Sequence, residues 1–81
     1  MRVAVVEIYD RIHICEKGSG FWHMMGYDIY RDIESAWRKA KRIADQNRDK
    51  AEVIEGPDGF IIRDNVTKTE RLIRIVERSI L

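Results

Sequence analysis

The first sixteen residues show a strand-like pattern of apolar and polar positions. Residues 2–9 (RVAVVEIY) are apolar and β-branched on both sides, with only Glu7 interrupting, which predicts a strand buried on both faces. Asp10 and Arg11 then suit a tight connection. Residues 12–16 alternate, with isoleucines on one side and His13 and Cys15 on the other. The pattern therefore predicts an N-terminal hairpin, which ends at the flexible stretch 17–20.

Residues 21–30 (FWHMMGYDIY) hold four of the seven aromatic residues and two of the three methionines of the chain. As an extended segment, residues 21–25 would alternate between two sides: Phe21, His23 and Met25 on one, Trp22 and Met24 on the other. Gly26 would break or bulge such a strand. The remaining residues, 27–30, would lead into the next element.

A helix is predicted over residues 33–46. Asp32 is a good N-cap and Asn47 a reasonable stop. Between them, apolar residues follow helical spacing, and a basic face lies opposite. The apolar positions are Ile33, Ala36, Trp37, Ala40, Ile43 and Ala44.

Residues 51–64 (AEVIEGPDGFIIRD) have the chemistry of a β-hairpin. Pro57 and Asp58 suit the two corners of a type I turn, and Gly59 can adopt the left-handed conformation that a bulged closure needs. We expect Ile54, Phe60 and Ile62 to share the face that meets the helix. Val53 and Ile61 would then lie on the other face.

The C-terminal residues 66–81 are predicted to form a second, amphipathic helix. Thr67 and Glu70 match a capping box. A broad apolar stripe follows, made of Leu72, Ile73, Ile75, Val76 and Ile80. The predicted order is β-β-(β)-α-β-β-α, an α+β fold in which a small, mostly antiparallel sheet carries one packed helix. The chain would form a single domain, with a body at 1–65 and the C-terminal helix docked in cis or against a second chain.

The middle of the chain resembles a family of very small uncharacterised bacterial domains. The matching residues lie between 32 and 64: the segment 32–36 (DIESA), the alanines Ala40 and Ala44, and the segment 52–64 (EVIEGPDGFIIRD). In that family a short β section precedes an alanine-rich helix, an acidic-apolar strand, an Asp-Gly turn and a returning strand. The resemblance implies a fold and no site residues, since the family has no settled activity.

Composition and charge narrow the possible functions. Fifteen basic and fourteen acidic residues leave a net charge of +1, so no overall field steers the chain toward nucleic acid or an anionic membrane. A single cysteine cannot form an intramolecular disulfide, which favours a reducing compartment. No stretch has the length of a membrane span or the pattern of a signal peptide. We therefore expect a cytoplasmic domain.

Catalytic and metal chemistry have weak support in the sequence. His13, Cys15 and His23 could supply three soft ligands, with a carboxylate such as Glu16 or a water as the fourth. Structural zinc sites, however, usually present two tight pairs of ligands. A Cys15 nucleophile would need an adjacent base and an oxyanion site. No phosphate-binding loop or carboxylate pair is recognisable. We expect a non-enzymatic protein without a metal or cofactor.

The prediction that remains is association with another protein, most simply as a homodimer. Met and aromatic residues are enriched at interfaces, and only one side of residues 21–25 can be buried. The segment would be half core and half interface, and the C-terminal stripe would add to it. The predicted interface residues are Trp22, Met24, Met25, Tyr27, Ile75 and Ile80.

Nucleic-acid binding is the alternative. A local excess of four positive charges lies between residues 37 and 50, on and just after the predicted helix. Clustered cations on a helix face can contact phosphates. The residues are Arg38, Lys39, Lys41, Arg42, Arg48 and Lys50, against Asp45 and Asp49.

Overall fold

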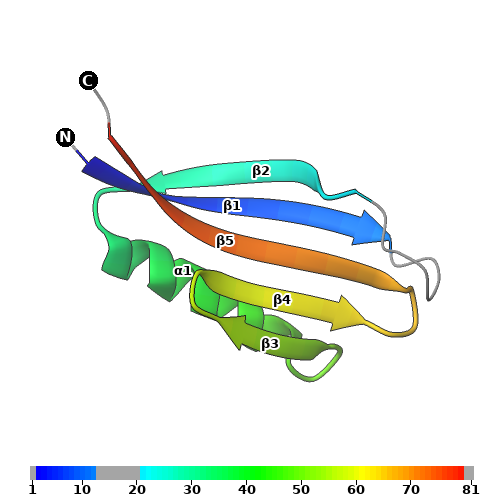
Figure 1. The fold of residues 1–81 in the computed structure, drawn as a ribbon. Coiled ribbons are helices and arrows are strands. Elements are labelled where there is room, and N and C mark those ends of the chain that lie inside the picture. The colour runs from blue at the N-terminus through cyan, green and yellow to red at the C-terminus, as the bar shows by residue number, and fades with distance from the viewer. Residues whose placement is uncertain (1, 13–20, 80–81) are drawn as a thin grey trace.

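The computed structural model describes residues 2–12 and 21–79, which form five strands and one helix (Figure 1). All the strands belong to one antiparallel sheet, in the order β2-β1-β5-β4-β3. The last strand in sequence is thus the central one. The elements are β1 (Arg2–Ile12), β2 (His23–Tyr30), α1 (Ile33–Asn47), β3 (Glu52–Gly56), β4 (Gly59–Asp64) and β5 (Thr69–Ser79).

The helix α1 covers one face of the sheet. In Figure 1 it passes behind β4, so the viewer looks onto the face that α1 leaves open, which we call the helix-free face. The core lies between α1 and the sheet, and three fully buried alanines let the helix approach closely. The buried core residues are Ala4, Val6, Ala36, Ala40, Ala44, Phe60, Ile62, Ile73 and Ile75.

The predicted C-terminal helix is wrong, because residues 69–79 form β5. The apolar pairs at 72–73 and 75–76 satisfy a helical stripe, but they equally suit a strand with apolar side chains on both faces. Ile73 and Ile75 point toward α1, whereas Leu72 and Val76 occupy the helix-free face. A helix here would have left β1 and β4 with unpaired edges, while β5 pairs with both of them.

The predicted capping box does not form either. Asp64 accepts hydrogen bonds from the backbone N–H groups of Val66 and Thr67 at 2.9 and 3.2 Å, which closes the turn between β4 and β5. These hydrogen bonds hold the pKa of the Asp64 carboxyl below its usual value. Lys68 takes a left-handed conformation with φ of 57° just before β5 begins.

The N-terminal hairpin was also predicted wrongly at its turn. Asp10 and Arg11 continue β1 instead of ending it, and they pair with Arg71 and Glu70 of β5. The second strand expected at 12–16 falls outside the described residues beyond Ile12. The long β1 results from pairing along its whole length with the equally long β5.

The aromatic segment forms β2, which starts at His23 and runs through Gly26 to Tyr30. Residues 27–30 are therefore strand and not a lead into the helix. Ile8 pairs with Gly26 and Tyr9 with Met24, so Met25 is an extra residue at a β-bulge. The bulge agrees with the irregularity predicted at Gly26.

The helix prediction is confirmed. Asp32 has extended backbone angles, and its Oδ1 accepts a hydrogen bond from the Ser35 N–H at 2.7 Å. This hydrogen bond lowers the pKa of the Asp32 carboxyl. Trp37 packs edge-on against Phe60, with ring centroids 5.8 Å apart, and so joins α1 to β4.

The β3–β4 hairpin is confirmed as well, but the predicted assignment of its faces is wrong for two residues. Gly56 pairs with Gly59 across Pro57 and Asp58, which places Ile54 opposite Ile61 on the helix-free face. Val53 lies opposite Ile62 and packs against the core instead. The two-residue connection sets this register, and the alternation of a strand then fixes every face.

Candidate protein interface

Within residues 2–12 and 21–79, the edge strand β2 carries four of the nine large apolar side chains that the fold leaves exposed, more than any other element. Tyr27 and Met25 are each 61% exposed, and Ile29 is 58% exposed. Phe21, just before the strand, and Met24 within it are exposed too. We call these five residues, Phe21, Met24, Met25, Tyr27 and Ile29, the β2 surface.

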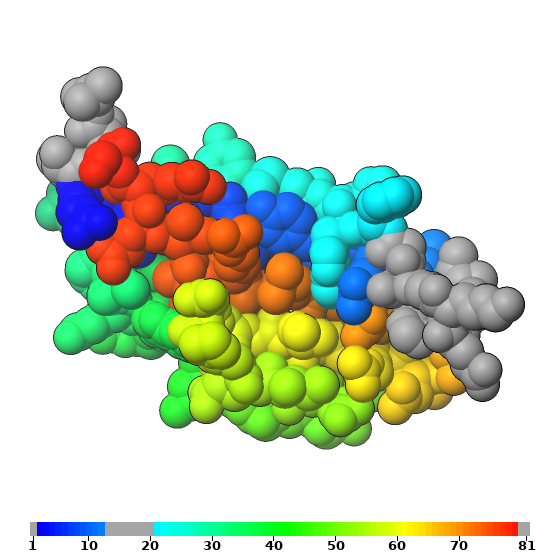
Figure 2. All heavy atoms as spheres, in the orientation of Figure 1, coloured from blue at the N-terminus to red at the C-terminus, as the bar shows by residue number. Residues whose placement is uncertain are grey.

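The pairing with β1 shows how the β2 surface is oriented. Ile29 lies opposite Val5, Tyr27 opposite Glu7 and Met24 opposite Tyr9, so all three side chains of β2 project on the helix-free face. Figure 2 shows this face, which residues 21–30 border along its upper rim. Beyond β2 the sheet has no further strand within residues 2–12 and 21–79, so one row of its backbone groups lacks a strand partner there.

The strand at the opposite edge of the sheet, β3, has features that usually prevent an edge strand from pairing with another chain. Strand β3 has only five residues, two of which are Glu52 and Glu55, and Pro57 follows it directly. Short length, charges and proline all discourage edge-to-edge association. In β2, the only acidic residue is Asp28, and there is no lysine, arginine or proline. Thus β2 has fewer of these features than β3, although its β-bulge at Met25 is one of them.

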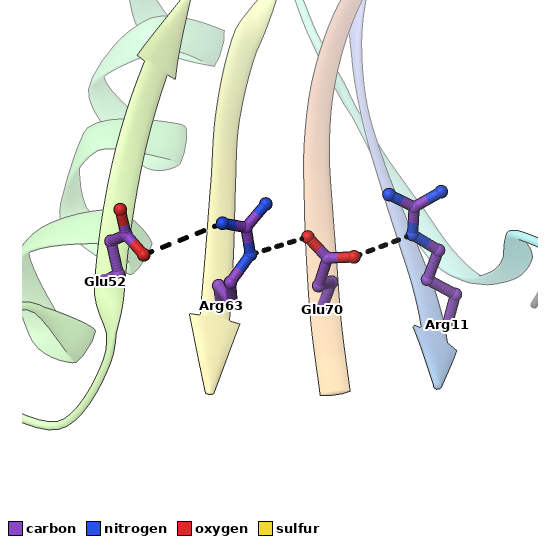
Figure 3. Close-up of polar contacts among 4 residues, drawn as sticks. All are labelled: Arg11, Glu52, Arg63 and Glu70. Carbon is purple, nitrogen blue, oxygen red and sulfur yellow. Dashed lines mark hydrogen bonds and ion pairs between the residues drawn. The ribbon is translucent and has the colours of Figure 1, made fainter. Parts of the chain in front are cut away.

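A row of alternating charges crosses the helix-free face over four strands (Figure 3). Glu70 on β5 accepts hydrogen bonds at 3.0 Å from Nε of Arg63 on β4 and from Nε of Arg11 on β1. Arg63 also lies 3.8 Å from Glu52 on β3. Each neighbouring pair is directly opposed in the register, so the row is a product of strand pairing.

The Glu70 carboxylate is held ionised within this row. Burial by itself raises the pKa of Glu70, but the hydrogen bonds from Arg63 and Arg11 outweigh burial and hold the pKa below its usual value. A carboxylate stabilised in this way is a weak proton acceptor at neutral pH. We therefore interpret the row as a structural tie between strands.

Trp22 is joined to the same row. The Arg11 guanidinium carbon lies 4.1 Å from the centre of the Trp22 ring, a cation–π contact. Trp22 is half-buried as a result. The structure thus separates Trp22 from the exposed residues with which the sequence grouped it.

Charged and polar groups also occupy the middle of the helix-free face. The Glu7 side chain is buried, and its carboxylate lies 3.5 Å from Nη2 of Arg78. Burial raises the pKa of the Tyr9 hydroxyl, and the negative charge of Glu7 adds to this rise. A flat partner stacked on this face would have to dehydrate the exposed guanidinium of Arg78, whereas a partner at the β2 edge would not.

The structure describes five of the six predicted interface residues, and they lie in three different environments, of which the half-buried one is that of Trp22. Met24, Met25 and Tyr27 are exposed on β2. Ile75 is 7% exposed and faces α1 in the core, so it cannot reach a partner in this fold. Ile80 lies outside the described residues. Sequence reasoning missed Ile29, although its alternation with Tyr27 is the signal of a strand with one shared face.

The basic residues do not form one cluster. Arg38, Lys41 and Arg42 surround a shallow depression on the outer side of α1, together with Asp45. Arg48 donates to Asp45 at 2.8 Å. Lys50 follows the C-terminal end of α1 and lines a different depression, together with Asn47 and Asp64. Lys39 is half-buried. Three of the six predicted cations therefore share one surface.

Most of the predicted metal ligands lie outside the residues that the structure describes. His13, Cys15 and Glu16 lie outside the described residues, and His23 is exposed at the start of β2. Within residues 2–12 and 21–79, no group of three histidine, cysteine or acidic side chains is placed to hold a metal ion.

The fold and this surface together define a small α+β domain with an exposed apolar edge strand. No protein-family model, curated protein or solved structure matches the chain. The helix α1, the one helix in the described part of the chain, is neither long nor apolar enough to cross a membrane.

Proposed function

We propose that this protein is a small, non-enzymatic interaction module that self-associates through β2. The observation that carries the proposal is the concentration of exposed apolar side chains on one edge strand that has a single acidic residue and no lysine, arginine or proline. Large apolar groups gathered on one surface, and edge strands with few charges and no proline, are both typical of association sites. The C-terminal segment has no part in this proposal, because it forms the central strand of the sheet.

Sedimentation velocity over a concentration series up to about 100 μM tests the proposal, since that range covers the affinities of weak and moderate dimers. We expect a dimer whose population rises with concentration. Tyr27→Lys and Ile29→Lys should each shift the chain to monomer, because a lysine on an edge strand opposes pairing. Ile54→Lys is the matched control: Ile54 is exposed on the same face but lies on the opposite edge strand, β3. A wild-type chain that stays monomeric throughout the series would contradict self-association.

A second candidate function is nucleic-acid binding by the outer side of α1. One observation supports it: Arg38, Lys41 and Arg42 all line a single depression. Binding of a short single-stranded RNA or a DNA duplex should weaken steeply as salt increases, and Arg38→Glu with Arg42→Glu should abolish it. The β2 variants above should leave this binding intact in the monomer. No detectable affinity at low salt would remove this candidate.

A further inference from the structure

The outer edge of β2 contains one stretch that is regular enough to pair with another strand. Residues 26–30 keep unbroken register with β1, from Gly26 opposite Ile8 to Tyr30 opposite Ala4. The bulge interrupts the strand on the N-terminal side of Gly26. A bulge bends a strand and disturbs its hydrogen-bond ladder, so a second strand can add most readily along these five residues.

Symmetry limits how a second copy can add there. Two identical strands that pair antiparallel within one sheet are related by a two-fold axis perpendicular to the sheet. The residue on the axis then lies opposite its own copy. If all five regular residues take part, the residue on the axis is the middle one, Asp28.

The side chains favour this register on both faces. On the helix-free face, Tyr27 would lie opposite the partner's Ile29, and Ile29 opposite the partner's Tyr27. Pairs of an aromatic and a β-branched residue stabilise antiparallel strands. On the α1 side, Gly26 would face the partner's Tyr30, and the structure leaves open space where a side chain at Gly26 would be.

Resting on the proposed self-association, we infer that β2 pairs with β2 of a second copy about a two-fold axis at Asp28. The two sheets then join into one continuous ten-stranded sheet, with both α1 helices on the same side. The charged groups of the helix-free face, such as Glu7 and Arg78, stay in their present surroundings. This is the physical advantage of edge pairing over stacking two helix-free faces.

The arrangement has one unfavourable contact, which gives a distinctive test. Asp28 lies opposite the partner's Asp28, and like charges directly opposed across strands are destabilising. Replacing the carboxylate with a neutral amide of the same shape removes the repulsion. Asp28→Asn should therefore tighten the dimer by roughly two- to five-fold in Kd.

Disulfide cross-linking in a Cys15→Ser background tests the register directly. Opposed residues have Cα atoms about 4.5–5.5 Å apart, which permits a disulfide, whereas diagonal neighbours at about 7–8 Å are too distant. Under mild oxidation, Asp28→Cys should form a covalent dimer. A mixture of the Tyr27→Cys and Ile29→Cys proteins should also cross-link. Each of these two variants alone should give no more covalent dimer than Val66→Cys. Val66 is exposed and lies far along the chain from β2, so this variant measures cross-linking by random collision.

The outcomes separate the register from the self-association on which it rests. A dimer by sedimentation that cross-links through Tyr27→Cys alone or Ile29→Cys alone, and not through Asp28→Cys, would overturn the register and leave self-association standing. A dimer that none of these cysteines links would likewise overturn the two-fold axis at Asp28. A chain that is monomeric throughout would overturn both proposals.

Discussion

Arg71 forms a bidentate pair with Asp10: its Nε and Nη2 donate hydrogen bonds to the two carboxylate oxygens at 2.7 and 2.8 Å. The two residues are directly opposed on β5 and β1, on the face that α1 covers. Bidentate pairing of this kind is the strongest geometry available to arginine and a carboxylate. The contact therefore adds a side-chain link to the backbone pairing that holds the two longest strands in register.

A charge-reversal cycle on this pair tests the central position of β5. Asp10→Arg and Arg71→Asp should each lower the free energy of unfolding by about 1 kcal/mol, because each places like charges opposite one another. The double variant should recover at least half of the loss. Urea denaturation measures all three, and independent, additive effects would show that the two residues do not face each other.

Glu70 should be the most sensitive acidic residue of the helix-free face. Glu70→Gln leaves Arg11 and Arg63 without their shared carboxylate and should lower the free energy of unfolding by about 2 kcal/mol. This loss is smaller than that expected on breaking a fully buried ion pair, because both arginines are partly hydrated. Glu52→Gln, at the exposed end of the same row, should change stability by less than about 0.5 kcal/mol.

The pH dependence of Glu70 has a definite sign. Its pKa is lower in the folded state than in the unfolded chain, so its stabilising effect is complete above about pH 4.3 and is lost as the pH falls through the folded value. The wild-type protein should lose stability in acid more steeply than Glu70→Gln. Equal slopes below pH 5 in the two proteins would argue against the ionised, doubly paired carboxylate.

Gly59 should tolerate no side chain. A Cβ there would lie 1.8 Å from the backbone oxygen of Ile73, and φ is +150°. Gly59→Ala should therefore destabilise the protein by about 3 kcal/mol or prevent folding. Gly26→Ala is the matched control, because nothing lies within 4 Å of its Cβ position. Similar melting temperatures for the two variants would contradict this packing of β4 on β5.

The N-cap of α1 should have a measurable effect on thermal stability. Asp32→Ala removes the acceptor for the Ser35 N–H and should lower the melting temperature by roughly 4–8 °C in a domain of this size. Asp32→Asn keeps an acceptor and should lose much less. The pKa of Asp32 is lower in the folded protein than in the unfolded chain. The difference in melting temperature between the wild-type protein and Asp32→Ala should therefore shrink as the pH falls below about 4.

Self-association through β2 also predicts how stability depends on concentration. If the dimer binds only the folded state, the wild-type melting temperature should rise with protein concentration. Tyr27→Lys should remove this dependence while changing the monomer stability by less than about 0.5 kcal/mol, since Tyr27 is mostly exposed. Ile54→Lys should retain the dependence. A melting temperature independent of concentration in the wild-type protein would oppose a dimer.

Local chemistry in the sequence determined the elements whose signals lie close together in the chain. The helix followed from the N-cap at Asp32 and the spacing of its alanines, and the β3–β4 hairpin followed from the turn residues around Pro57. The exposed residues of β2 could be anticipated in part, because only one side of a strand at the edge of a thin core can be buried.

Pairing between distant segments decided the rest. Apolar residues at 72, 73, 75 and 76 fit a helix and a two-sided strand equally well, so the sequence pattern alone could not separate them. The backbone of β5 pairs with β1 and β4, and its partners in β1 lie between 57 positions (Ile12 and Thr69) and 77 positions (Arg2 and Ser79) away in the chain. These contacts exist only in the folded sheet. The same long-range pairing brought Arg11, Glu70 and Arg63 into one row and left β2 at the edge of the sheet.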